Sequence, residues 1–311
     1  MCALEQRSTA GGRRRDASAD TDGNDPVLPA ETQSVLNRHF SASARYWEEL
    51  YTEPTVFGVI HQERHARTLA WIDELSLPPA SQVLEVGCGA GLMAADLFRR
   101  GFVVDCIDPS EAMVELARAR AATLDASDRI RVREGDAHSL PFATDSRDLV
   151  VALGVLPFLH SPTVALGEVA RVLRPGGHFL FSSDNPYRLT HWLDPRLTPL
   201  VAPAKRFAKS ILHHYGFDRQ RMAARGFSHD ALARLLRGAG FSIAKCVTLG
   251  FGPFTLFARR LLPEATAITV HRRLQVRADH GAPILSATGA QHLVLATLRT
   301  PADPLTVATR A

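Results

Sequence analysis

The sequence has few cysteines and no long apolar segment. Its four cysteines stand singly at positions 2, 88, 106 and 246, without a CxxC pair or a Cys/His spacing typical of metal ligands. This pattern argues against a disulfide framework and a structural zinc site. The longest apolar run, residues 149–159, is much shorter than the roughly 20 residues that a membrane-spanning helix needs. No apolar segment follows the arginines at 13–15, so we expect no signal peptide and a cytoplasmic protein.

A large charge of one sign is also missing. Lys and Arg total 36 against 32 Asp and Glu, which leaves a net charge of +4. An excess of four does not indicate a nucleic-acid-binding protein, and the sequence shows neither an RNA-binding module nor a long basic stripe. Hydrophobic residues at 46% and charged residues at 22% predict a folded globular chain. At 311 residues it is long enough for one large α/β domain with additions or for two small domains.

Composition divides the chain into segments. In the N-terminal helical segment, Ala66, Leu69, Ile72 and Leu75 recur every three residues, which places Arg64 on another helix face. The predicted segments are a disordered tail at 1–30, a helical lid at 31–79, an α/β core at 80–184, an insertion at 185–225, the C-terminal part of the core sheet at 226–300 and a tail at 301–311.

Strand and helix signals alternate through the core segment. Helical segments that begin near Leu92, Ser110 and Val164 separate apolar stretches typical of strands at 83–86, 103–108, 130–132, 149–153 and 179–181. This alternation predicts a parallel sheet with helices on both faces. Further on, Ser228 is placed to cap a helix, and strands are expected at 241–249 and 291–298.

Three alternate glycines follow the first of these strands. Gly87, Gly89 and Gly91 stand between the strand and the helix that begins at Leu92. Glycine permits positive φ and close approach of a ligand to the backbone, and the helix N-terminus offers unpaired N–H groups. We therefore expect a nucleotide-like cofactor at this end of the sheet, although a glycine turn without a ligand is the alternative. NAD is disfavoured, because the third glycine of G-x-G-x-x-G would fall at Leu92.

The form E-x-G-x-G-x-G at 85–91 resembles motif I of the class I S-adenosylmethionine (SAM) dependent methyltransferases. Within this family, the chain most resembles the methyltransferases that act on small molecules, ubiquinone and menaquinone. Four further sequence blocks resemble those of the family and occur in the same order along the chain, at 104–113, 134–142, 147–156 and 168–182. The resemblance implies a Rossmann-like, mostly parallel sheet of seven strands, with an N-terminal helical lid and an insertion after the fifth strand. It also implies SAM as the cofactor, S-adenosyl-L-homocysteine as its product, and no metal.

The resemblance assigns roles to residues at the strand ends. Asp108 accepts hydrogen bonds from both ribose hydroxyls, Asp136 accepts one from the adenine amino group, and His138 faces the adenine edge. Asp105 points to the opposite side of its strand, which predicts a structural role. The complete set of implied cofactor-binding residues is Glu85, Gly87, Cys88, Gly89, Gly91, Asp108, Pro109, Met113, Asp136, Ala137, His138, Leu153 and Gly154.

The sequence gives only weak signals for a catalytic base. His160 after the fourth strand, and His191 and Tyr215 in the insertion, are candidates, although each also suits a surface or capping role. Asp184 and Asn185 follow the fifth strand, but no Asp stands after the fourth strand to complete a metal site. We therefore expect no metal.

Two features of the sequence bear on the methyl acceptor. Aromatic residues at 40, 46, 47, 51 and 57 either form a lid over the cofactor or pack on the sheet, and the insertion carries eight Arg and Lys against two Asp. We expect an enzyme that methylates a small organic acceptor by in-line displacement, most simply at an oxygen of a specialised metabolite. The alternative is a prenylated quinone or lipid at a membrane surface that contacts residues 185–225. RNA methylation and a non-catalytic SAM-binding subunit are further alternatives, and the oligomeric state stays open.

Overall fold

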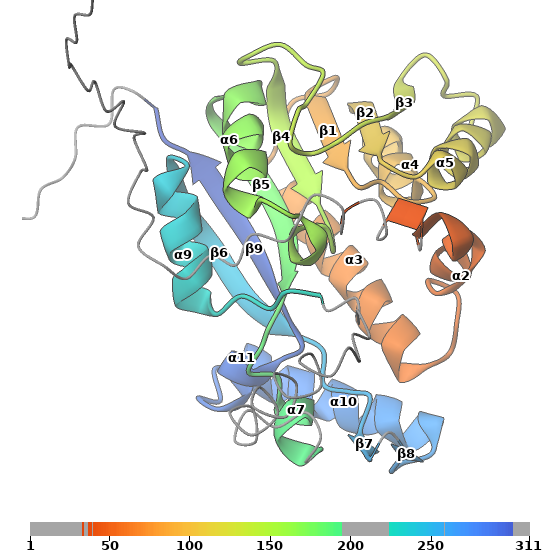
Figure 1. Ribbon diagram of the computed structural model, residues 1–311, viewed down its shortest axis with the longest axis vertical. Coiled ribbons are helices and arrows are strands. Elements are labelled where there is room, and N and C mark those ends of the chain that lie inside the picture. The colour runs from red at the N-terminus through yellow and green to blue at the C-terminus, as the bar shows by residue number, and fades with distance from the viewer. Residues whose placement is uncertain (1–32, 34–36, 39, 195–223, 258, 301–311) are drawn as a thin grey trace, which may run out of the picture.

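The computed structural model describes residues 33, 37–38, 40–194, 224–257 and 259–300 (Figure 1). The tails predicted at 1–30 and 301–311 lie outside these residues, as does most of the predicted insertion, residues 195–223.

A seven-stranded sheet forms the centre of the fold. Its strand order is β3-β2-β1-β4-β5-β9-β6. The first five strands in this order are parallel, whereas β9 runs antiparallel to both β5 and β6. The strands are β1 (Gln82–Val86), β2 (Val103–Asp108), β3 (Ile130–Glu134), β4 (Arg147–Ala152), β5 (Leu173–Asp184), β6 (Phe241–Leu249) and β9 (Gln291–Leu298). The predicted Rossmann-like, mostly parallel sheet is confirmed.

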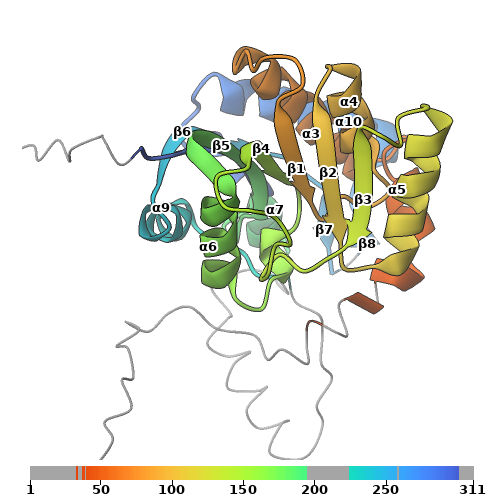
Figure 2. The same ribbon diagram turned by 90° about the horizontal axis from the view of Figure 1, so that it is seen from above.

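Helices cover both faces of the sheet (Figures 1 and 2). One face packs against α3, α4 and α5, and the other against α6 and α9. The remaining elements lie around the sheet ends, and a hairpin of two short strands, β7 and β8, stands apart from the sheet. The bounds are α2 (Ala44–Glu49), α3 (Val56–Glu74), α4 (Leu92–Arg99), α5 (Glu111–Thr123), η1 (Leu156–Phe158), α6 (Pro162–Val172), α7 (Leu189–Leu193), α9 (His229–Gly238), β7 (Thr255–Leu256), β8 (Arg259–Arg260), α10 (Glu264–Asp279) and α11 (Leu285–Thr288).

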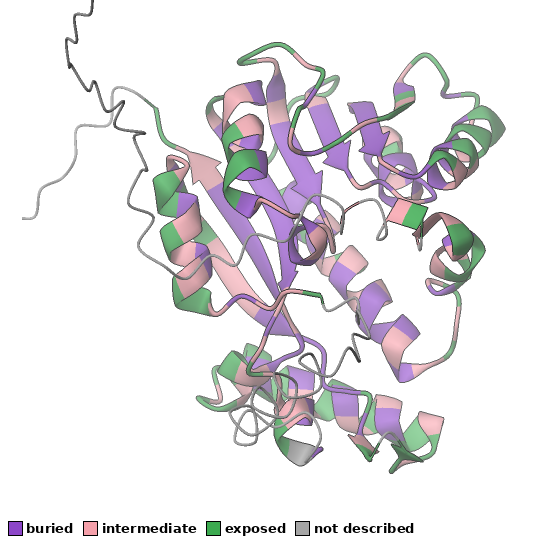
Figure 3. Cartoon of the chain, viewed as in Figure 1, coloured by how far each residue is buried: buried purple, intermediate pink, exposed green. Residues whose placement is uncertain are grey.

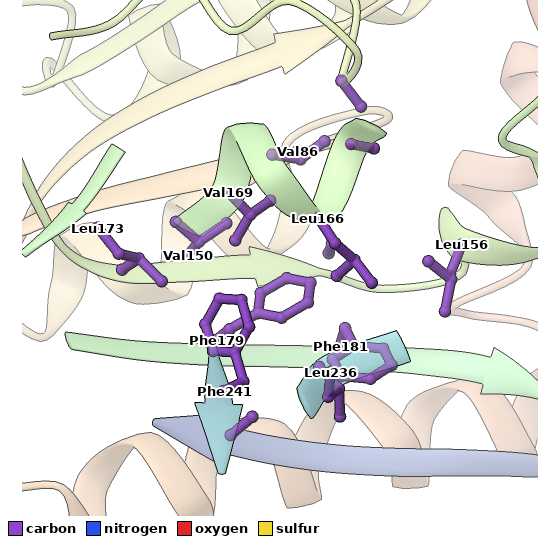
Figure 4. Packing of buried hydrophobic residues seen from close by; sticks show 14 of the residues in the cluster. Val86, Val150, Leu156, Leu166, Val169, Leu173, Phe179, Phe181, Leu236 and Phe241 are labelled. Atoms are coloured by element: carbon purple, nitrogen blue, oxygen red, sulfur yellow. The ribbon is translucent and has the colours of Figure 1, made fainter. Parts of the chain in front are cut away.

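Alternation along β5 fills both layers of the core. Phe179 and Phe181 point to the α6 and α9 side, with their rings stacked at 4.7 Å between centroids, while Leu180 joins the opposite cluster (Figure 4). A strand buried on both faces must be apolar at successive positions, as this one is. Burying a side chain of this size stabilises the fold by about 1.5–3 kcal/mol. Figure 3 shows that the central strands are largely buried.

The N-terminal helices differ from the expectation in one respect. Thr55 caps α3 by accepting a hydrogen bond from the N–H of Gly58 (3.1 Å). Ile72 is buried, and Leu69 and Leu75 pack against the core as expected, but Ala66 is exposed and Arg64 is buried, so the prediction is wrong at these two positions. The reason lies in tertiary contacts: the guanidinium of Arg64 donates hydrogen bonds to Ser182 and Gln291 of the sheet. The long helix α10 also packs along α3, with a hydrogen bond between His271 and Glu63 (2.9 Å). None of the helices described is both long enough and apolar enough to cross a bilayer.

Candidate active site

A cavity of about 760 Å³ lies at the carboxyl ends of the parallel strands. Loops after β1, β2, β3 and β4 line one side of it, and α3 and η1 line the other. The strand order reverses between β1 and β4, where open α/β sheets bind their ligands. The first side consists mainly of loop backbone and acidic side chains, and the second of helical side chains.

The three glycines after β1 all have positive φ, but for different reasons. A Cβ atom on Gly87 would lie 2.4 Å from Val155, and one on Gly91 would lie 3.0 Å from Ala117. Both glycines therefore permit close packing within the protein. At Gly89, with φ +52°, nothing lies closer than 4.0 Å. Gly89 is thus the position where a ligand can approach the backbone.

Asp108 ends β2 and is buried beside the glycine loop. Its Oδ2 accepts a hydrogen bond from the N–H of Gly89 (2.9 Å) and its Oδ1 accepts one from Ser110 (3.0 Å). Burial raises the pKa of Asp108, and these two N–H groups oppose that rise. A carboxylate has about four acceptor positions, so each oxygen can accept a further donor from the cavity.

Asp105 lies on the other side of β2 and has a different role. Its carboxylate accepts hydrogen bonds from Arg147 (2.8 Å) and Arg131 (3.0 Å), and it does not line the cavity. These contacts join β2 to the two strands β3 and β4, as expected of a structural residue.

Glu85 is a second buried acid in the cavity wall. Burial, with a smaller contribution from the negative charge of Asp108, raises its pKa to about 8. The side chain is therefore largely protonated at neutral pH. A cationic ligand group would favour its charged form.

The loop after β3 holds an aspartate and two histidines. Asp136 accepts hydrogen bonds from the backbone N–H (2.9 Å) and Nδ1 (2.6 Å) of His138, which lowers the pKa of Asp136. Nε2 of His138 accepts a hydrogen bond from the backbone N–H of Ser161 (3.2 Å). The ring also lies 3.7 Å from that of His160 between centroids. This pair of rings joins the loop to the start of α6.

The structure brings most of the predicted cofactor residues together. Eleven of the thirteen line the cavity, the exceptions being Gly91, which caps α4, and His138. Of the predicted bases, neither His160 nor His191 lines it, and Tyr215 lies outside the described residues. The individual binding roles stay predictions. The residues that line the cavity are Glu85, Gly87, Cys88, Gly89, Asp108, Pro109, Met113, Asp136, Ala137, Leu153 and Gly154.

Arg64 of α3 presents a buried positive charge to the cavity. Its guanidinium donates to the hydroxyl of Tyr51 (3.1 Å), Oε1 of Gln291 (3.2 Å) and Oγ of Ser182 (3.4 Å). It forms no ion pair with a carboxylate in the described part of the chain, and its Nε has no hydrogen-bond partner there. A buried cation with only neutral partners is unfavourable, so the arrangement is suited to an anionic ligand group.

His61, one turn before Arg64, presents a neutral imidazole. Its Nδ1 donates to the carbonyl of Phe57 (2.9 Å), and burial and the charge of Arg64 lower its pKa to about 3. The proton therefore stays on Nδ1, and Nε2 carries a lone pair. No described residue donates a hydrogen bond to that nitrogen, and the side chain lines the cavity.

Aromatic side chains complete this side of the cavity. Phe40 contacts Phe158 (5.0 Å between ring centroids) and Trp47 (5.8 Å), and the ring of Phe57 lies 4.4 Å from that of His61. We call Phe40, Trp47, Tyr51, Phe57 and Phe158 the aromatic wall; all five line the cavity. Tyr46, also expected in a lid, is exposed and does not.

Sequence reasoning missed His61 and Arg64. A signal was present, because His61, Arg64 and Thr68 fall on the same face of α3 as the buried Trp71 and Ile72. Polar residues that interrupt the buried face of a helix indicate either a polar cavity or a buried network.

The chain is similar to known methyltransferases. A family profile described as a methyltransferase domain matches residues 84–181. The ubiquinone biosynthesis O-methyltransferase of Pseudomonas putida (strain GB-1) is 31% identical over 217 residues, which cover 70% of this chain and 86% of that protein. With three other curated relatives, the chain spans only 48%, 60% and 42% of their length.

Solved structures share the fold at low identity. A magnesium protoporphyrin IX methyltransferase from Synechocystis PCC 6803 with bound SAH has a TM-score of 0.57 at 18% identity, covering 86% of this chain and 99% of that chain. The [4+2]-cyclase SpnF also has a TM-score of 0.57, at 20% identity, covering 86% of this chain and 96% of that chain. At such identities the likeness shows the fold alone. The profile match, the Pseudomonas relative and the glycine loop with its buried acids together show that this chain belongs to the class I SAM-dependent methyltransferases.

Proposed function

We propose that the protein transfers the methyl group of SAM to an oxygen atom of a small organic acceptor held against the aromatic wall. The observation that carries this proposal is the division of one cavity into two parts. One part has an open glycine position and buried acids, and the other has aromatic rings, a neutral imidazole and a guanidinium that forms no ion pair with any described residue. Such a cavity accommodates two different ligands side by side.

The polar residues of the cavity fit the groups of SAM. When bound, SAM supplies an electrophilic methyl group on a sulfonium. Asp108 is placed to accept hydrogen bonds from vicinal hydroxyls, since each of its oxygens already holds one backbone donor and has capacity for another. Glu85 suits a cationic group and Arg64 suits a carboxylate, so together they match an amino-acid moiety.

His61 is the residue that we assign to the acceptor's proton. Its Nε2 accepts a hydrogen bond from the acceptor hydroxyl and takes the proton as that oxygen becomes methylated. An oxygen that is being alkylated becomes a far stronger acid than an imidazolium, so an imidazole with a pKa of about 3 still receives its proton. His61 then releases this proton to water, and the same low pKa makes the release fast.

A second acceptor class has specific support. The Pseudomonas putida relative, which the chain matches over 86% of its length, is named for ubiquinone biosynthesis. A prenylated quinone or another lipid has both a hydroxylated ring and apolar surface, and the aromatic wall suits such a molecule. Fold similarity alone does not decide the chemistry, since a solved neighbour is named a cyclase.

The proposal is tested by following the label from methyl-labelled SAM. Purified protein is incubated with a fractionated cell extract, and the label is measured in organic-soluble, water-soluble small-molecule and macromolecular fractions. We expect label in an organic-soluble or small-molecule fraction, and none with the Asp108→Ala variant. Label in RNA or protein, or SAM binding without any transfer, would contradict the proposal and favour an RNA methyltransferase, a protein methyltransferase or a non-catalytic SAM-binding subunit.

A further inference from the structure

A short hairpin stands at one end of the molecule (Figure 1). It exposes apolar and basic side chains together. β7 and β8 pair antiparallel, with Leu256 opposite Arg259. The side chains of Phe257 and Leu261 are 59% and 52% exposed, and Leu256 is also exposed. Phe257 has left-handed backbone (φ +49°), which is uncommon for a bulky residue. Large apolar side chains gathered on a surface indicate a contact site.

A tryptophan from another part of the chain extends this surface. Trp192 lies on α7, which packs against β7, and it is 46% exposed. We call Trp192, Leu256, Phe257, Arg259 and Leu261 the hairpin patch. In Figure 3 the hairpin is among the exposed parts of this end of the molecule.

The charge of the region is positive. Residues 255–279 contain five arginines and only two acids, Glu264 and Asp279. Both acids are paired, Glu264 with Arg260 (2.8 Å) and Asp279 with Arg67 (2.6 Å), and Arg272 is paired with Glu63 of α3 (3.6 Å). Arg259 is exposed and forms no ion pair with any residue that the structure describes. The patch therefore combines apolar side chains with positive charge that no described acid neutralises.

We propose that the hairpin patch docks the protein on a membrane surface that carries anionic lipids. Tryptophan, phenylalanine and leucine beside arginine are the composition of segments that lie in the headgroup region. There the rings enter the acyl boundary and the guanidinium groups meet anionic headgroups. The absence of a free carboxylate among the described residues of 255–279 removes the repulsion that would oppose this contact.

The hairpin is connected to the wall of the cavity. Glu264, which pairs with Arg260 of β8, also accepts a hydrogen bond at Oε1 from the N–H of Val56 (2.5 Å). Val56 is the first residue of α3, the helix that carries Phe57 and His61 into the cavity. Docking through the patch would hold this wall next to the bilayer and favour entry of a lipid-soluble acceptor. This consequence rests on the proposed function, whereas lipid binding itself does not.

Vesicle sedimentation with the full chain tests the proposal. We expect the protein to bind vesicles of phosphatidylglycerol and phosphatidylcholine at low salt, to be released at high salt, and to bind pure phosphatidylcholine weakly. Phe257→Ser combined with Leu261→Ser should lower the affinity about tenfold or more. Arg259→Gln should lower it about fivefold. Val164→Ser, at an equally exposed apolar residue on α6, is the matched control and should change nothing.

SAM affinity, measured by calorimetry on the same variants, should equal that of the wild type. This measurement shows that the variants are folded. It also distinguishes a protein that does not bind lipid from one that does not bind SAM, which would contradict the methyltransferase proposal. The proposal is overturned if the wild type does not bind anionic vesicles at low salt, or if the double variant binds as well as the wild type. It is also overturned if light scattering shows a dimer that the double variant converts to a monomer, because the patch would then cover a second copy of the chain.

Discussion

The glycine-loop side and the helical side of the cavity are built in different ways. Backbone conformation and short-range contacts shape the glycine-loop side, as when Asp108 accepts hydrogen bonds from Gly89 and Ser110. On the helical side, side chains distant in sequence meet, as when Arg64 donates to Gln291, 227 residues further on. We therefore expect substitutions on the first side to affect SAM binding. On the second side, a change at His61 should separate SAM binding from transfer to the acceptor, whereas a change at Arg64, which we assign to the carboxylate of SAM, should affect SAM binding as well.

Gly89→Val should have the largest effect and isolates the glycine-loop side. The left-handed backbone of Gly89 makes a β-branched residue costly by about 1–3 kcal/mol, and the side chain would fill the ligand's space. We expect SAM affinity, measured by calorimetry, to fall on the order of 100-fold. Gly167→Val is the control, because nothing lies within 4 Å of a Cβ atom there. Equal losses in both variants would show that the effect is not local to the loop.

His61→Phe isolates the helical side. The ring shape is kept while the lone pair on Nε2 is removed, so we expect kcat to fall about 100-fold, with SAM affinity close to that of the wild type. The comparison variant is His65→Phe one turn later, because His65 also lines the cavity but its imidazole pairs with Asp96 (2.8 Å). If SAM affinity fell together with kcat, His61 would have a structural role and not the role in proton transfer that we assign to it.

Arg64→Met tests whether the buried guanidinium binds an anionic ligand group. A hydrogen bond to a charged group contributes about 1.5–3 kcal/mol, so SAM affinity should fall about tenfold or more. The ligand-free variant should unfold at an equal or higher temperature, because a buried charge without an ionic partner is removed. Arg67→Met, which removes an ion pair with Asp279, should show the opposite pattern of lower stability and unchanged affinity. A large loss of stability in Arg64→Met would mean that the arginine mainly supports the fold.

The smallest predicted effect is the contribution of Glu85 to the pH dependence of the free energy of unfolding. Its pKa is about 8 in the folded protein and near its ordinary value of 4.5 when unfolded. The folded state therefore holds the proton more tightly. The contribution of Glu85 to the free energy of unfolding is therefore greatest below pH 4.5 and is lost as the pH rises towards 8.

Urea unfolding of the ligand-free protein between pH 5 and 9 measures this effect. The free energy of unfolding should fall less steeply with pH in Glu85→Gln than in the wild type. Parallel curves would show that Glu85 is not buried in the way the structure describes.

The same difference in construction explains what the sequence could predict. The strands at 241–249 and 291–298, the helix start near Ser110 and the cap at Ser228 agree with the structure, because apolar pattern and capping chemistry act over a few residues. The glycine loop is predictable for the same reason.

The helical side of the cavity could not be predicted in this way. The orientation of α3 depends on α10 and β9, as shown by the contact between Glu63 and His271, 208 residues apart. The spacing of apolar residues along α3 therefore predicts the wrong helix face for Arg64. The position of His160 after the fourth strand predicts a base, but its ring lies 3.7 Å from that of His138 and does not line the cavity. Local patterns do not report such tertiary contacts.

Calorimetric titration with SAM tests whether this cavity is the SAM-binding site. The titration compares two matched variants of β2, Asp108→Asn and Asp105→Asn. Both substitutions remove one buried negative charge from the same strand, but only Asp108 lines the cavity. We expect Asp108→Asn to lose SAM affinity about tenfold or more, and Asp105→Asn to keep that affinity while losing stability. Equal affinity in both variants would contradict the assignment of this cavity to SAM.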